Sequence, residues 1–421
     1  MHDDMTSINI IFTFIMIVYF FINSLRILRQ PISLTSKRFR MLAMSVDGNE
    51  NKVLNIKQHV VSIAPMMDYT DTHMRKLQRM ITKEAVLYTE MVVANALIRT
   101  DNPLKFLDCD LGIEEPVVLQ LGGGDPKQMF DAAKIATQYG YKQINLNVGC
   151  PSEKVAGAGC FGASLMLNPT LVSELCLAIK EATGRSATVK CRIGVNENDS
   201  YENLCQFITT VSNAGCVDHF IIHARKAILN AKFSPDDNRK IPPLKYDYVY
   251  RLVKDFPKLY FTLNGGVNNI NDTKMHLSHG VTGVMIGRAV INSPYNEWRN
   301  IDSLMYNKVS SSSSQDAWNR RKILEKYAEY ARHVTDKEGK KARRAVVKPL
   351  LNLFSGEPNG KQFRVILDET IKDDTVPIDQ VILQAQTCLH TDTLDLLQPY
   401  DSSLSHNIRR ETYKQRENAN M

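Results

Sequence analysis

The chain has 421 residues, of which 43% are hydrophobic and 23% charged, and its net charge is +7. This composition excludes a collagen, a coiled coil and a chain disordered throughout, and the small positive charge allows a nucleic-acid partner without requiring one. The eight cysteines include no Cys-x-x-Cys pair, which argues against a disulfide framework and a structural zinc site. We therefore expect reduced thiols and no metal.

Residues 1–45 resemble an address or an anchor and not a part of the fold. Ile8 to Ile22 form an almost unbroken apolar run, and the basic stretch from Arg26 to Arg40 contains no acid. A signal segment followed by a transit segment would direct the chain to an organelle such as a plastid. A membrane anchor would instead keep the basic side in the cytoplasm. Both interpretations stay open, and any membrane contact is expected only through this segment.

Residues 46–300 alternate between short apolar runs and longer amphipathic segments. The runs cover 60–66, 85–91, 116–121, 143–149, 187–193, 219–224, 260–265 and 283–288. Each run is apolar throughout, as expected for a parallel strand covered on both faces, and the segments between them have helical periodicity. Eight such repeats predict an α/β fold, a (β/α)₈ TIM barrel. An open doubly wound sheet is the alternative, but no Gly-x-Gly-x-x-Gly follows the first run.

The rest of the chain divides into three parts. Residues 301–316 contain the run Ser310–Ser314 and are predicted to form a linker. Residues 317–375 are predicted to form a small α-helical domain, and 317–372 hold 14 Lys and Arg against 7 Asp and Glu. Charge alone favours a solvated helix face over RNA binding. Residues 376–421 are expected to be a partly disordered tail.

The chemistry of a barrel lies at the C-terminal ends of its strands, where this sequence places polar and small residues. Gly265-Gly266 and Gly287-Arg288 follow the seventh and eighth runs, the usual phosphate site of barrels, although a glycine pair can also simply form a turn. Cys150 lies in a Gly-Cys-Pro loop, where its thiol would be held rigidly as a nucleophile or a proton donor.

Two further side chains at strand ends have more than one interpretation. Lys190, between Val189 and Cys191, could hold an anionic ring, form a Schiff base, or extend to solvent at the strand end. His223 could donate a hydrogen bond to a cofactor or be a core histidine.

Several segments together are similar to the tRNA-dihydrouridine synthase family. They are SIAPMMDYTD, LQLGGGDP, INLNVGCPSEKVAGAGCFGASLM, VKCRIG, IIHARKA, LNGGV and VMIGRA, in that order. NRKIPPLKY, HARKA and LLNLFSGEPNGKQFR resemble the A-type branch and its C-terminal helical domain. The resemblance covers residues 60–365, and so many motifs in the right order make chance agreement very improbable.

The resemblance implies an FMN-dependent enzyme that uses NADPH to reduce the C5–C6 double bond of uridines 20 and 20a in the tRNA D-loop. The cofactor contacts would then be Pro65, Met66, Met67, Gln120, Lys190, His223, Asn264, Gly265, Gly266, Gly287 and Arg288. The catalytic acid would be Cys150. The tRNA contacts would be Asn147, Arg225, Lys226, Arg239, Arg343, Arg344, Lys348 and Arg364.

The chemistry of that reaction agrees with the interpretation of the residues. Hydride delivered to C6 of uracil leaves charge at C5 and O4, so a fixed donor must protonate C5, and the thiol of Cys150 suits that task. Lys190 would stabilise the negative charge of reduced flavin. The target base must be turned out of the tRNA fold. With the resemblance, the basic helical segment becomes a predicted tRNA clamp.

Three alternatives remain at this point. A class I aldolase type of enzyme would use Lys190 for a Schiff base. An FMN-dependent reductase or dehydrogenase of a free pyrimidine, like dihydroorotate dehydrogenase, would not need the basic helical segment. A tRNA-binding protein without activity would not need Cys150, Lys190 and His223 together. The preference for NADPH or NADH stays open, because the sequence has no dinucleotide-binding fingerprint.

Overall fold

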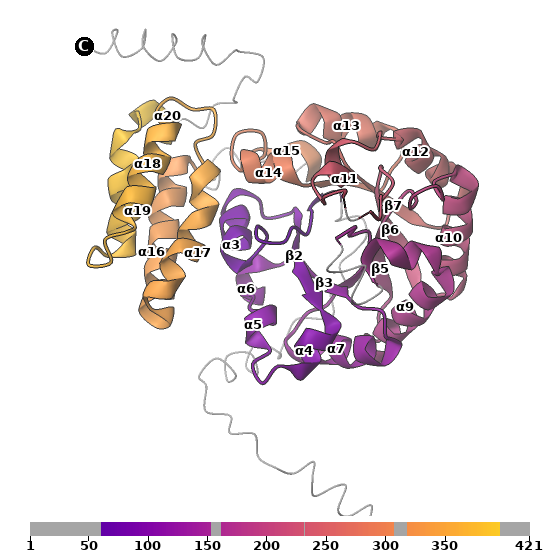
Figure 1. Ribbon diagram of the computed structural model, residues 1–421. Helices are drawn as coiled ribbons and strands as arrows, with labels where there is room; N and C mark the ends of the chain where they lie inside the picture. The colour runs from indigo at the N-terminus through magenta and orange to yellow at the C-terminus, as the bar shows by residue number, and fades with distance from the viewer. Residues whose placement is uncertain (1–59, 153–160, 231, 307–317, 396–421) are drawn as a thin grey trace, which may run out of the picture. The chain divides into compact units, whose positions relative to one another are not determined.

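The computed structural model describes residues 60–152, 161–230, 232–306 and 318–395. Within these ranges the chain forms a closed barrel of eight parallel strands, followed by a group of helices (Figure 1). Each strand pairs with the next one along the chain, and the first pairs with the last. The predicted α/β fold, a TIM barrel followed by C-terminal helices, is thereby confirmed. The predicted N-terminal address lies outside the described residues.

The strands begin within two residues of the apolar runs that predict them. They are β1 (Val61–Ile63), β2 (Val86–Val93), β3 (Val117–Gly122), β4 (Ile144–Val148), β5 (Ala187–Arg192), β6 (Val217–His223), β7 (Tyr260–Asn264) and β8 (Gly283–Ile286). The helices of the barrel segment are α3 (Thr72–Ile81), α4 (Ala94–Arg99), α5 (Leu104–Leu107), α6 (Leu111–Glu114), α7 (Pro126–Gln138), the 3₁₀ helix η2 (Gly162–Leu167), α9 (Pro169–Thr183), α10 (Tyr201–Asn213), α11 (Asp237–Lys240), α12 (Tyr246–Asp255), α13 (Ile270–Ser278), α14 (Arg288–Asn292) and α15 (Ile301–Tyr306).

Local sequence signals explain where the outer helices start and stop. The Asp125 side chain accepts the N–H of Gln128 at 2.8 Å and caps α7, whose first residue is Pro126. Asn168 caps α9 in the same way, and Gly184 ends that helix with a left-handed φ of 71°. A cap oxygen satisfies an N–H group that the helix leaves without a partner, and glycine adopts the left-handed conformation without strain.

The barrel interior changes from apolar to polar along the strands. An apolar cluster fills it, and its members are Ala64, Val86, Tyr88, Val118, Ile221 and Met285. Side chains two residues apart on a strand point to the same face. Gln120 and His223 therefore follow Val118 and Ile221 on the inner face, at the C-terminal ends of β3 and β6. The polar end of the barrel is where the sequence places the site.

The C-terminal helices have a hydrophobic core of their own. They are α16 (Arg320–Glu338), η3 (Lys340–Ala342), α17 (Arg343–Val347), η4 (Lys348–Asn352), α18 (Gly360–Thr370), α19 (Ile378–Ala385), η5 (Gln386–Cys388) and α20 (Thr391–Asp395). Met74 and Leu77 of α3 belong to the same apolar cluster as residues of these helices. The Tyr327 hydroxyl donates to Val346 O at 2.7 Å and joins α16 to α17. No helix in the described ranges is long and apolar enough to cross a membrane.

Two of the predicted boundaries differ from the structure. Residues 301–306, assigned to the linker, form α15, and the Tyr306 hydroxyl donates to Val61 O at 3.1 Å. Helices α19 and α20 lie in the range assigned to the tail, and Ile378, Val381 and Ile382 are buried in the helical core. The remainder of both predictions, residues 307–317 and 396–421, lies outside the described residues.

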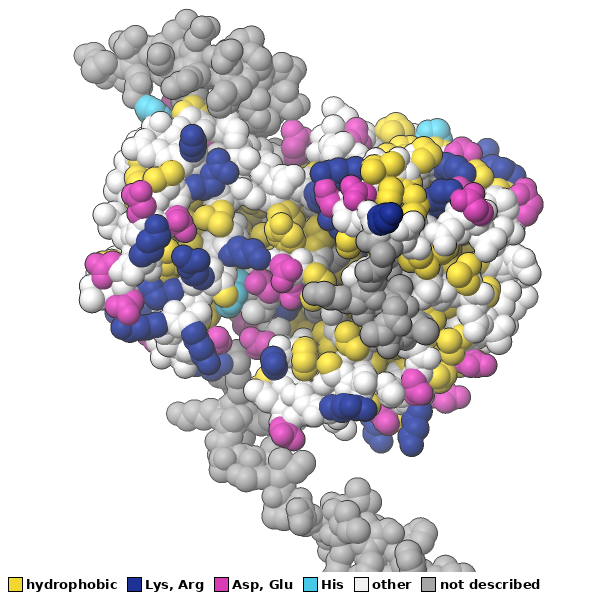
Figure 2. All heavy atoms as spheres, in the orientation of Figure 1, with side chains coloured by type: hydrophobic (Ala, Val, Ile, Leu, Met, Phe, Trp, Pro, Cys, Tyr) yellow, Lys and Arg dark blue, Asp and Glu magenta, His cyan; other side chains and the backbone are white. Residues whose placement is uncertain are grey.

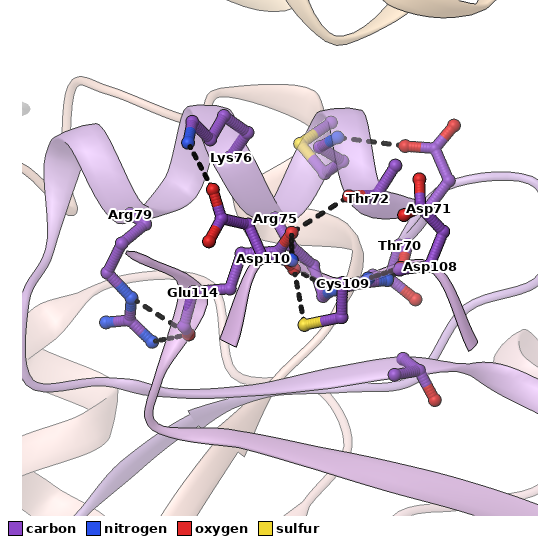
Figure 3. A network of polar contacts seen from close by, with 12 residues as sticks. Thr70, Asp71, Thr72, Arg75, Lys76, Arg79, Asp108, Cys109, Asp110 and Glu114 are labelled. Atoms are coloured by element: carbon purple, nitrogen blue, oxygen red, sulfur yellow. Dashed lines mark hydrogen bonds and ion pairs between the residues drawn. The ribbon is translucent and has the colours of Figure 1, made fainter. Parts of the chain in front are cut away.

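A buried ion pair anchors α3, the helix that contributes Met74 and Leu77 to the core of the C-terminal helices (Figure 3). Arg75 Nε lies 2.6 Å from Glu114 Oε2, and both side chains are at most 5% exposed. The Thr72 hydroxyl donates to the other carboxylate oxygen at 2.8 Å. Burial alone would raise the pKa of Glu114, but the charge and hydrogen bonds around it, above all from Arg75, lower the pKa below its ordinary value. Breaking this pair would leave an uncompensated buried charge, so α3 is held firmly against the segment that ends in α6.

Candidate active site

A chain of amide hydrogen bonds crosses three strands at the polar end of the barrel. Asn147 Nδ2 donates to Gln120 Oε1, and Gln120 Nε2 donates to Asn145 Oδ1, both at 2.8 Å. Asn145 Nδ2 donates to Thr188 Oγ1 at 2.9 Å. All four side chains are buried. Each amide in this series has a hydrogen-bond partner in the next side chain. The series therefore fixes the orientation of Asn147 at the end of β4.

Asn147 shapes the turn that carries Cys150. Its Oδ1 accepts the N–H of Gly149 at 3.1 Å and that of Cys150 at 3.0 Å. The carbonyl of Cys150 accepts the N–H of Ala163 at 2.8 Å, so the cysteine backbone is bound on both its N–H and C=O groups. The sequence predicted a tRNA contact for Asn147. Both ends of its buried amide are used within the protein, and we therefore assign it to the positioning of Cys150.

Arg192 clamps the same turn from the next strand. Its Nε donates to Gly149 O at 3.0 Å, and its Nη1 donates to Lys226 O and Asn238 O, both at 2.9 Å. The side chain is 3% exposed. Burial lowers the pKa of Arg192 to about 10, which leaves the guanidinium charged at neutral pH. Arg192 is not among the predicted site residues, although its spacing of two from Lys190 puts both on one strand face.

Lys190 points toward β7 at the barrel mouth. Its Nζ donates to Asn264 Oδ1 at 3.0 Å, and Asn264 Nδ2 donates to Met285 O at 2.8 Å. Burial and the nearby charge of Arg192 lower the pKa of Lys190 to about 8. In the β4–β5 ladder Lys190 lies opposite Asn147, three residues before Cys150. Lys190 and Asn264 are therefore in contact at the barrel mouth, and β4, which leads to Cys150, pairs with the strand of Lys190.

His223 ends β6 among positive charges. Burial and the charges of Arg192, Lys190, Arg225 and Arg288 lower the pKa of His223 well below its ordinary value. The imidazole is consequently neutral at pH 7, with one nitrogen able to donate a hydrogen bond. A Cβ atom on Gly265 would lie 2.6 Å from His223 Cδ2, so only glycine lets the loop after β7 approach this ring.

The loops after β7 and β8 present backbone donors. The φ angles of Gly265 and Gly266 are +112° and +73°, a region that favours glycine. Within the described part of the chain, the N–H groups of Gly265, Gly266 and Gly287 donate no hydrogen bond. A Cβ on Gly287 would meet Met66 Sδ at 3.7 Å, so this loop lies beside the loop after β1. Free N–H groups next to cationic side chains are the ordinary make-up of a phosphate site.

The loop after β1 forms another edge of the mouth. Pro65 and Met66 are half-buried, whereas Met67 is 55% exposed. The Met66 N–H donates to Thr70 Oγ1 at 2.9 Å, which fixes the loop before α3 begins. These three predicted cofactor residues are therefore placed side by side, with Met67 facing solvent.

The predicted cations of the barrel rim pair with acids or carbonyl groups. Arg239 Nη2 lies 3.2 Å from Asp236 Oδ1, and Arg288 Nη1 lies 3.9 Å from the same atom. Lys226 Nζ lies 3.5 Å from Asp199 Oδ2. Arg225 Nη1 donates to Pro242 O. The pairs of Arg239 and Arg288 are close to half exposed. Such pairs are weak and can exchange for a phosphate.

The predicted cations of the helical segment divide into two kinds. Arg344, Lys348 and Arg364 are exposed, and Lys348 Nζ donates to Asp68 O in the loop after β1. Arg343 is buried, and its guanidinium donates to Val376 O at 2.9 Å and Asp373 O at 3.0 Å. We therefore remove Arg343 from the predicted tRNA contacts. Figure 2 shows the Lys and Arg side chains of α16–α19 interspersed with Asp and Glu on the face in view.

Comparison with known proteins shows the family of this chain. The model of the dihydrouridine synthase family matches residues 62–389. The chain is 42% identical over 328 residues to the tRNA-dihydrouridine(20/20a) synthase of Synechocystis, covering 77% of this chain and 94% of that protein. It is 41% identical over 309 residues to the protein of the same name from Xanthomonas campestris, covering 73% and 88%. The Escherichia coli protein of that name is 41% identical over 308 residues, with 73% and 85% covered. The chain therefore belongs to the dihydrouridine synthase family of flavin-dependent reductases.

Proposed function

We propose that this protein is a tRNA-dihydrouridine synthase that reduces uridines 20 and 20a of tRNA, with FMN as its flavin and NADPH as the source of hydride. The names of the relatives described above support the substrate and its positions. The observation that carries the proposal is the backbone of Cys150, bound at its N–H and C=O groups, with the half-buried Lys190 on the adjacent strand. A proton donor and a cation at the same barrel mouth are what the reduction of uracil requires.

The donor set fits FMN. Free N–H groups on Gly265, Gly266 and Gly287, with Arg288 beside them, suit a phosphate dianion. Lys190 and the neutral His223 supply a cation and a donor for an electron-rich ring. Pro65, Met66 and Met67 offer an apolar edge. These residues are the ones that would hold the cofactor, whereas the amides of Gln120 and Asn264 are bonded within the protein and orient Asn147 and Lys190.

The chain's own residues account for the rest of the reaction. Reduced flavin, when bound, would supply hydride to C6 of uracil. The Cys150 thiol would give its proton to C5, and the Asn147 cap together with Arg192 fixes the backbone of the turn that carries this thiol. Holding a donor in place in this way contributes about 10²–10⁴ in rate. The charge of Lys190 would stabilise the negative charge of the reduced flavin ring, because opposite charges attract more strongly where water is partly excluded.

Contact with tRNA would rest on phosphates. Arg225, Lys226 and Arg239 lie around the barrel rim, and Arg344, Lys348 and Arg364 lie on the helical segment. Each phosphate neutralised releases counterions, so binding should weaken steeply as salt is added. Lys348, which reaches the loop after β1, connects the helical segment to the barrel mouth.

The test uses the purified full chain with FMN, NADPH and a tRNA made without modifications. Nucleoside mass spectrometry would measure dihydrouridine, and primer extension would give its position. Dihydrouridine at 20 and 20a, absent from a tRNA with cytidine at both positions, supports the proposal. Reduction of free pyrimidines without reduction of tRNA would replace it with a pyrimidine reductase. Binding of tRNA without any product would show a tRNA-binding protein.

A further inference from the structure

The peptide between Gly265 and Gly266 is free to take more than one orientation unless something holds it. Both residues have positive φ angles, +112° and +73°, and neither has a side chain to restrict rotation. Gly265 follows β7 directly, so this peptide lies at the end of the strand where the phosphate site is proposed. Its orientation decides which way the Gly266 N–H group points.

Tyr246 holds this peptide. Its hydroxyl donates to Gly265 O at 2.9 Å. In a trans peptide the C=O and N–H groups point in opposite directions, so the Gly266 N–H points away from Tyr246. That N–H has no acceptor in the described part of the chain. A Cβ atom on Gly266 would overlap the tyrosine hydroxyl and lie 2.7 Å from Leu244 Cδ1, so the contact also requires glycine there.

The tyrosine is itself held in place. It is the first residue of α12, and its ring meets the His276 ring edge-on, with centroids 4.5 Å apart. The Tyr250 hydroxyl lies 2.7 Å from His276 Nδ1 and fixes that imidazole. Burial raises the pKa of Tyr246, so its hydroxyl keeps the proton it donates throughout the neutral range.

We propose that Tyr246 is a positioning residue for the cofactor phosphate: it locks the Gly265–Gly266 peptide so that the Gly266 N–H is presented to the phosphate of FMN. The inference rests on the proposed function, because it takes FMN as the ligand. Tyr246 acts only through the peptide that it orients. Removing its hydroxyl should therefore weaken recognition of the phosphate and leave recognition of the flavin ring unchanged.

Two flavins separate these effects, since riboflavin has the ring of FMN without the phosphate. The full-chain apoprotein would be titrated with each flavin by fluorescence quenching. Loss of one ordered hydrogen bond predicts that Tyr246→Phe binds FMN about tenfold more weakly, with riboflavin affinity unchanged. Tyr248→Phe is the matched control, because Tyr248 lies on the same helix but packs edge-on to Tyr201 with centroids 5.4 Å apart. Neither affinity should change in that control.

Gly266→Ala provides an independent second variant. Its methyl group would displace the Tyr246 hydroxyl, so the same selective loss of FMN affinity is expected. Equal losses of FMN and riboflavin affinity in Tyr246→Phe, or no loss of either, would overturn the inference while leaving the proposed function intact. A wild-type protein that binds neither flavin would overturn the proposed function and this inference with it.

Discussion

The side-chain oxygen of Asn147 accepts the backbone N–H of Cys150 at 3.0 Å. The nitrogen of the same amide donates to Gln120 inside the barrel at 2.8 Å. One buried side chain therefore connects the turn that carries the proposed proton donor to the interior of β3. The backbone of Cys150 is therefore positioned by the barrel and not by the loop alone.

Asn147→Ala should slow reduction of tRNA by about 100-fold, because a shift of the reacting group by about an ångström costs that much. Reduction of the bound flavin by NADPH should be unchanged, since it does not need the cysteine. Asn147→Asp is the matched variant: it keeps an oxygen to cap Gly149 and Cys150 but cannot donate to Gln120. In single-turnover measurements, the rate of tRNA reduction by Asn147→Asp should lie between those of Asn147→Ala and wild type. Equal defects in both variants would mean that the cap does not position the thiol.

Cys150→Ala should lower the rate of tRNA reduction by about 10²–10⁴, the usual contribution of a positioned acid. Binding of flavin and of tRNA should persist. Cys388→Ala serves as the control, because that thiol lies in η5 of the helical segment and donates to Ala385 O at 3.3 Å. Stopped-flow measurement of the rate at which tRNA reoxidises the reduced flavin compares the two variants with wild type. Full activity in Cys150→Ala would assign protonation to another group.

Affinity for FMN should fall as pH rises from 7 to 9. Burial and Arg192 lower the pKa of Lys190 to about 8, so the free protein loses this positive charge within that range. A group with that pKa becomes about tenfold less protonated over these two pH units, and binding of an anionic ligand should weaken by the same factor. Lys190→Met should bind more weakly at pH 7 and show a nearly flat profile. A wild-type profile that does not change with pH would contradict this role.

Substitutions of Arg343 and Arg364, both in the helical segment, should have opposite effects. Arg364→Ala should reduce the slope of tRNA affinity against salt by about 1 and leave thermal unfolding unchanged, because Arg364 is exposed. Arg343→Ala should lower stability by about 2 kcal/mol, since it removes charged donors from two backbone carbonyls. The slope of tRNA affinity against salt should be the same in Arg343→Ala as in wild type. A change of slope in Arg343→Ala with no loss of stability would return Arg343 to the tRNA contacts.

The barrel could be predicted because each strand is buried on both faces and therefore appears as a continuous apolar run. The C-terminal ends of those runs then indicated where Lys190, His223 and Gly265 lie, since all parallel strands of a barrel end on one side. The resemblance identified the family from the motifs at the same ends. Both predictions use patterns within short segments of sequence, so neither needs knowledge of contacts between distant residues.

Other features depend on contacts between distant segments, which no local pattern records. Arg343 looks like its exposed neighbour Arg344, and its burial follows from carbonyl groups 30 and 33 residues further along. Tyr306 ends α15, and its hydroxyl donates to Val61 O, 245 residues away, which ties that helix to the barrel. The roles of Asn147 and Arg192 depend equally on partners from neighbouring strands. In each case the residue type was visible in the sequence, but its partner was not.

The visible spectrum of the purified full chain tests the central claim most directly. NADPH added without oxygen should bleach the flavin bands, and unmodified tRNA should then restore them, with one dihydrouridine formed for each flavin reoxidised. This result would show cofactor, donor and acceptor in one experiment. Bands that stay bleached with tRNA but return with a free pyrimidine would contradict the account.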